Sequence, residues 1–75
     1  MRVYVLEFDT RDALSRGFAR LLDDAHVEAC SAETEKLRVR FLSPKDAGDL
    51  VHRIYQEGGL RGCVGHRVGA KGATL

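Results

Sequence analysis

The sequence KLRVRF, residues 36–41, alternates between polar and apolar residues without a break. In a β-strand, successive side chains point to opposite faces, so the pattern predicts a strand over residues 35–42. One face of this strand carries the apolar residues Leu37, Val39 and Phe41. The other face carries three cations, Lys36, Arg38 and Arg40.

Three further segments have the composition of strands. Residues 2–8, RVYVLEF, are rich in β-branched and aromatic residues, and residues 26–32, HVEACSA, form a weaker match. Polar residues 33–35 separate this second segment from the strand over 35–42, which is the spacing of a hairpin. Residues 62–68, GCVGHRV, predict a last strand that glycine weakens.

Two segments instead repeat their apolar residues with the period of a helix. Over residues 10–25 the stripe is Leu14, Phe18, Leu21, Leu22 and Ala25, and Asp9 or Thr10 is expected to cap the helix. Over residues 43–59, Ser43 is expected as the cap, Pro44 as the first helical residue and Gly58–Gly59 as the stop. The stripe of this second helix is Ala47, Leu50, Val51, Ile54 and Tyr55.

The element order is therefore strand, helix, strand, strand, helix, strand. Right-handed crossovers fold this order into a four-stranded antiparallel sheet, strand order 4-1-3-2, with both helices on one face. This α+β arrangement is the ferredoxin-like βαββαβ sandwich. We expect a single domain over residues 1–68 and a flexible C-terminal tail over residues 69–75.

The first strand can be oriented in two ways, because both of its faces are apolar. We favour the orientation in which Val3 and Val5 pack under the helices, which leaves Tyr4 and Leu6 on the open face beside the arginines. The opposite orientation, with Tyr4, Leu6 and Phe8 under the helices, fits the composition nearly as well.

Length and charge restrict the possible functions. A chain of 75 residues buries only about 60% of the surface of its unfolded form, so it has room for one core and no deep cleft. Its formal net charge of +1 provides no bulk attraction to nucleic acid or membrane. The apolar runs are shorter than the ~20 residues of a membrane span, and the N-terminus lacks the pattern of a signal peptide. We expect a cytoplasmic protein.

The chain resembles the RNA recognition motif in three segments. VYVLEF is similar to the first-strand signature of that family, the Leu14-x-x-x-Phe18 spacing agrees with its first helix, and FLSPKDAGDLV is similar to the end of its third strand and the following helix. The resemblance implies weak, sequence-tolerant binding of single-stranded RNA, with Tyr4 stacked on a base. Lys36 and Arg38 replace the family's third-strand glycine and aromatics, so Lys36, Arg38, Arg40 and Arg67 would contact phosphates.

A second resemblance leads to a different class of function. FDTRDALSRGFARLLDDAHVEA is similar to the start of ACT domains, although Asp12 and Ala13 stand where that family often has proline and glycine. It implies a regulatory or protein-interaction module that forms a homodimer. The exposed Leu6 would then contact a protein partner. The third interpretation of the basic face is a surface that contacts only solvent.

No catalytic, metal or cofactor site is expected. The three histidines are scattered and have no metal-ligand spacing with the cysteines, and Asp9 after the first strand is the position of a helix cap. Cys30 and Cys63 fall on the two opposite edge strands of the expected sheet. Three strand spacings, roughly 14 Å, exceed the ~7 Å limit between disulfide-bonded Cα atoms, so both should be free thiols.

Overall fold

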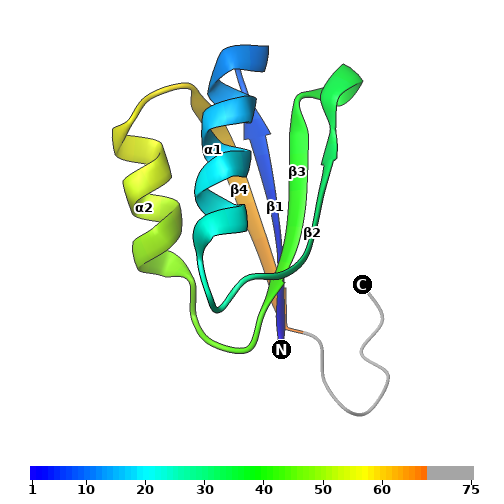
Figure 1. Ribbon diagram of the computed structural model, residues 1–75, viewed down its shortest axis with the longest axis vertical. Coiled ribbons are helices and arrows are strands. Elements are labelled where there is room, and N and C mark those ends of the chain that lie inside the picture. Colours follow the sequence, from blue (N-terminus) through cyan, green and yellow to red (C-terminus); the bar gives the residue numbers. More distant parts are fainter. Residues whose placement is uncertain (68–75) are drawn as a thin grey trace.

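The computed structural model describes residues 1–67 and confirms the expected order of the elements (Figure 1). These are β1 (Arg2–Phe8), α1 (Arg11–Asp23), β2 (Glu28–Glu33), the 3-10 turn η1 (Thr34–Lys36), β3 (Arg38–Ser43), α2 (Gly48–Gln56) and β4 (Leu60–Arg67). The tail expected over residues 69–75 lies outside the described residues.

The four strands form one antiparallel sheet in the order β2-β3-β1-β4. Both helices lie on the same face of this sheet (Figure 1), and within residues 1–67 no helix covers the other face, which we call the open face. Strand β1 lies between β3 and β4, so β2 and β4 are the two edges. This is the predicted ferredoxin-like arrangement, because the orders 2-3-1-4 and 4-1-3-2 describe the same sheet from its two edges.

The predicted orientation of β3 is confirmed. Val39 and Phe41 are completely buried beneath the helices, whereas Arg40 is exposed on the open face. Ser43, which continues the inward parity, is also buried. The alternation of apolar and basic residues was sufficient to predict which face of β3 is buried, because only one set of alternate residues is apolar.

The favoured orientation of β1 is wrong, and the alternative holds. Leu6 is 0% exposed and Tyr4 is 7% exposed, and both pack in the core with Phe8 beneath the helices. In the register of β1 and β3, Tyr4 faces Phe41 and Leu6 faces Val39 across the strands. Cross-strand partners share a face of the sheet, so the inward parity of β3 requires the inward parity of Tyr4 and Leu6.

Tyr4 is held in the core by both its ring and its hydroxyl. The ring stacks on Phe41 with centroids 5.1 Å apart, and the hydroxyl oxygen accepts a hydrogen bond from the backbone N–H of Ala47 at 3.0 Å. The polar end of the side chain therefore satisfies a buried donor just before α2, which valine at this position could not do.

Helix α1 begins as expected. The side chain of Thr10 accepts a hydrogen bond from the backbone N–H of Ala13 at 3.1 Å, which confirms Thr10 as the cap. Within the helix, Gly17 is buried against Phe8. The apolar stripe is narrower than predicted, because Leu22 and Ala25 are exposed.

The predicted start of the second helix is wrong. Helix α2 begins at Gly48, because Ser43 completes β3 and its hydroxyl donates to the backbone carbonyl of Lys45 at 2.8 Å instead of capping a helix. Asp46 then accepts a hydrogen bond from the N–H of Gly48 at 2.8 Å. The predicted stop is confirmed, since Gly58 and Gly59 have positive φ angles of 91° and 88°.

The hairpin between β2 and β3 differs from the prediction at its tip. Lys36 belongs to η1 and not to a strand, and Leu37 follows it with a φ of 54°. Only Arg38 and Arg40 of the three predicted cations therefore lie within β3.

Candidate functional site

The open face of the sheet has one charged half. Arg38 lies between Glu33 of β2 and Glu7 of β1 in the strand register. Its guanidinium is 3.5 Å from the carboxylate of Glu7, and the ammonium of Lys36 is 3.6 Å from that of Glu33. Of Lys36, Arg38 and Arg40, only Arg40 has no carboxylate of the described residues within 4 Å. Two of the four cations expected on this face are therefore paired with neighbouring carboxylates.

The other half of the open face is aliphatic. Val5 lies between Arg40 of β3 and Val64 of β4, and Val3, which is buried with 5% exposure, lies beside Leu42. Val64 is 50% exposed. Apolar residues on both faces of β1 are typical of strands that are covered on both sides, whereas the helices cover one.

The structure does not bring the predicted site residues together on this face. Tyr4 and Leu6 point away from it into the core, so neither can stack on a base nor contact a partner there in the folded chain. Lys36, Arg38 and Arg40 follow one another along the β3 hairpin. The backbone of Arg67 pairs with Arg2 at the end of β4, and its side chain lies outside the described residues.

The hydrogen bonds of β1 show which backbone groups of β4 face outward. The N–H of Phe8 donates to the carbonyl of Leu37, at the start of β3, at 2.8 Å. The backbone groups of successive residues in a strand point to opposite neighbouring strands. Phe8 bonds to β3, so Val5, three residues earlier, bonds to β4, and its partner Val64 bonds to β1. The N–H and C=O groups of Cys63 and Gly65 therefore lie on the outer edge of β4, where the described residues provide no further strand.

A groove runs along this edge on the helix side. It has a volume of about 440 Å³ between α2 and β4. Its apolar lining comes from Val51, Tyr55, Leu60 and Cys63. Tyr55 is 62% exposed, although the helical stripe predicted it in the core, and its ring stacks loosely on His52 with centroids 6.5 Å apart. Exposed apolar groups thus flank the β4 edge on both sides, Tyr55 on the helix side and Val64 on the open face.

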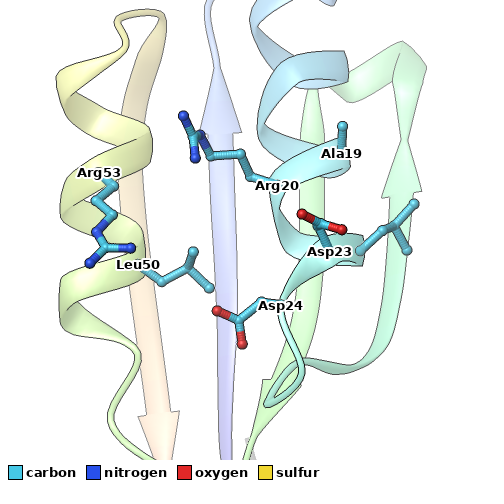
Figure 2. Close-up of a pocket in the computed structure, with 7 residues that line it drawn as sticks. Ala19, Arg20, Asp23, Asp24, Leu50 and Arg53 are labelled. Carbon is cyan, nitrogen blue, oxygen red and sulfur yellow. The ribbon is translucent and has the colours of Figure 1, made fainter.

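A second groove lies between the last turns of α1 and the middle of α2 (Figure 2). Its volume is about 680 Å³, and charges of both signs surround Leu50 at its centre. Arg20 is already bound to Glu57, and this hydrogen bond raises the pKa of Arg20 and lowers that of Glu57. Three further charged residues complete the rim: Arg53 of α2, Asp23 of α1 and Asp24, the C-cap of α1. The mixed charge favours no single class of ligand.

The described residues contain no cluster of three or more histidine, cysteine or acidic side chains that could hold a metal ion. Cys30 and Cys63 are free thiols on opposite edge strands, as predicted. Desolvation raises the pKa of both thiols, so neither has the thiolate character of an activated nucleophile.

No protein-family model matches the chain, and neither the curated proteins nor the solved structures include a significant match. In the described part of the chain, neither helix is long and apolar enough to cross a membrane.

Sequence reasoning missed the β4 edge as a candidate site. The glycines of LRGCVGHR marked it as a weak strand, and Tyr55 fitted the apolar stripe of the helix. The exposure of Tyr55 depends on where α2 lies relative to β4, which the periodicity of the helix does not specify. The signal that was present is the scarcity of charge in residues 60–65, where Arg61 is the single charged residue.

Proposed function

We propose that the chain is a small, non-catalytic protein-binding module that takes up an extended polypeptide strand along the outer edge of β4. The observation that carries this proposal is the outward-facing backbone of Cys63 and Gly65, bordered by Tyr55 on one face and Val64 on the other. Strand addition at such an edge derives its affinity from main-chain hydrogen bonds and its specificity from alternate side chains.

The groove defines the chemistry of the partner. Side chains on one face of the added strand would enter the apolar space beside Val51, Leu60 and Tyr55. Side chains on the other face would lie beside Val64. A strand with small or aliphatic side chains and few charges fits this surface best, because burying an unpaired charge is costly.

The observations favour this function over RNA binding. The open face has no aromatic side chain among the described residues, and Arg38 and Lys36 are already paired with glutamates. Stacking contributes roughly 1–3 kcal/mol per base, and Tyr4 is buried away from this face. Binding of single-stranded RNA through Arg40 and its neighbours stays a prediction, as does a cytoplasmic location.

The test is a titration of isotopically labelled protein with two probes, observed by NMR. The first probe is a set of peptides selected for binding from a displayed library of random heptapeptides. The second is a mixed pool of single-stranded RNA at low salt. We expect peptides with small or aliphatic side chains and few charges, and we expect them to shift the amide signals of Cys63, Gly65 and Tyr55.

The variant Cys63→Pro removes one outward N–H and should abolish peptide binding, whereas the control Cys63→Ala keeps the N–H and should bind as the wild type does. Equal binding by both variants would contradict strand addition. Failure of the library to yield a peptide that contacts β4, in a chain that sediments as a monomer, would also overturn the proposal. RNA-induced shifts at Arg38 and Arg40, without peptide binding, would instead support the nucleic-acid prediction.

A further inference from the structure

The two edges of the sheet differ in how well they are protected. Strand β2 has two exposed glutamates, Glu28 and Glu33, and its pairing with β3 shifts between Glu28 and Ser31, where Ala29 has a φ of 48°. Charges and irregularities of this kind prevent an edge from pairing with another strand. The pairing of β4 with β1 has no register shift over Arg2 to Glu7 of β1. The backbone of β4 is therefore regularly paired from Gly62 onward, and so is its outer edge.

From this contrast we infer that the strand bound at β4 is the β4 of a second copy of the chain, paired antiparallel about a two-fold axis at Val64. This inference rests on the proposed function and names its partner. The two sheets would then join into one eight-stranded sheet whose helices all lie on the same side. A two-fold interface of this kind closes on itself and needs one self-complementary surface.

Charge supports a second copy as the occupant. The segment from Leu60 to Gly65 has a single charged side chain, Arg61, and its guanidinium is bound to Asp9 at 3.0 Å. Residues 62–65, which lie nearest the axis, therefore carry no charge, and in this register Arg61, already bound to Asp9, lies opposite Arg67 of the second copy at the two ends of the interface. Two copies of β2 would bring Glu28 and Glu33 of each chain together, and like charges across a strand pair are destabilising.

The backbone and the side chains together select the register. The outward groups of Cys63 and Gly65 can bond to those of Gly65 and Cys63 in the second copy, which places the two Val64 residues opposite each other as a non-hydrogen-bonded pair. Side chains approach most closely in such pairs, with Cα atoms about 4.5 Å apart. The half-exposed Val64 of each copy would thereby be covered by the other.

The register can be tested by disulfide crosslinking of the full chain. In a background of Cys30→Ser and Cys63→Ser, the variant Val64→Cys places thiols at the two-fold axis, within reach of a disulfide bond. The matched control is Gly62→Cys in the same background. A Cβ at Gly62 meets nothing within 4 Å, but in this register the two copies of residue 62 are roughly 13 Å apart along the strands.

Under mild oxidation at micromolar concentration, we expect the Val64→Cys protein to form crosslinked dimers on a denaturing gel. The Gly62→Cys control should remain monomeric on the same gel. Sedimentation of the wild type should show a dimer. Wild-type Cys63 should crosslink poorly, because its copies are offset along the strands. Efficient crosslinking through Cys63 or Gly62→Cys, with none through Val64→Cys, would contradict this register. A wild-type monomer that still binds peptides at β4 would overturn self-pairing and leave the proposed function standing, whereas a monomer that binds none would overturn both.

Discussion

The two faces of the sheet use the same four strands, yet they differ in what their apolar residues do. On the face beneath the helices, Leu6, Val39 and Phe41 are completely buried. On the open face, Val5 and Val64 lie beside one another with only part of their surface covered. The closed core therefore lies mainly beneath the helices, although Val3 is also buried, whereas Val64 on the other face is available for contact with another molecule.

The comparison is tested most strongly by truncating adjacent residues of β1 that point to opposite faces. Leu6→Ala should lower the free energy of unfolding by about 2–5 kcal/mol, because it leaves a cavity in a closed core. Val5→Ala should cost only about 1 kcal/mol, since its side chain is partly exposed and no closed cavity is left. Urea unfolding followed by circular dichroism measures both values. Equal losses would show that the open face is packed as tightly as the covered one.

A second test concerns the contact between α1 and the covered face. A Cβ at Gly17 would lie 2.5 Å from Cζ of Phe8, so Gly17→Ala should cost about 1–3 kcal/mol of stability despite the better helix propensity of alanine. The control Ser15→Ala, at an exposed position of the same helix, should change stability by less than about 0.5 kcal/mol. Thermal unfolding distinguishes the two. A stabilised Gly17→Ala would mean that α1 can move away from Phe8 without loss.

The polar contact of Tyr4 should have a smaller effect. Tyr4→Phe keeps the ring that stacks on Phe41 but removes the oxygen that accepts from the N–H of Ala47, so we expect a loss of about 0.5–1.5 kcal/mol. Tyr55→Phe, at the exposed end of α2, should have no measurable effect on stability. Amide hydrogen exchange at Ala47 provides a direct reading, and unchanged protection in Tyr4→Phe would contradict the contact.

The smallest expected effect depends on pH and involves the exposed link between the two helices. The hydrogen bond from Arg20 lowers the pKa of Glu57 in the folded chain, so this pair stabilises the fold above the pKa of an unfolded glutamate and is lost as the pH falls through the lowered value. Glu57→Gln should therefore be slightly less stable than the wild type at neutral pH and equally stable in acid. Urea midpoints at the two pH values measure the difference, and a constant difference would exclude this ionisation as its cause.

The strands show how much of this fold and of its candidate site could be predicted. In β3 one parity is apolar and the other basic, so the sequence alone identified Val39 and Phe41 as core residues. In β1 both parities are apolar, and the wrong one was favoured for Tyr4 and Leu6. Because the predicted site depended on that choice, the site residues of β1 could not be found by periodicity.

The order of the elements, the strand topology, the Thr10 cap and the stop at Gly58 and Gly59 could be predicted from the amino acids alone, because local propensities and short-range spacing are sufficient for these features. Three features became known from the folded chain: the orientation of β1, the start of α2 at Gly48 and the exposure of Tyr55 beside the β4 edge. Each of these depends on contacts between segments distant in the chain. The register of β1 against β3 orients Tyr4, and the position of α2 against β4 leaves the groove open.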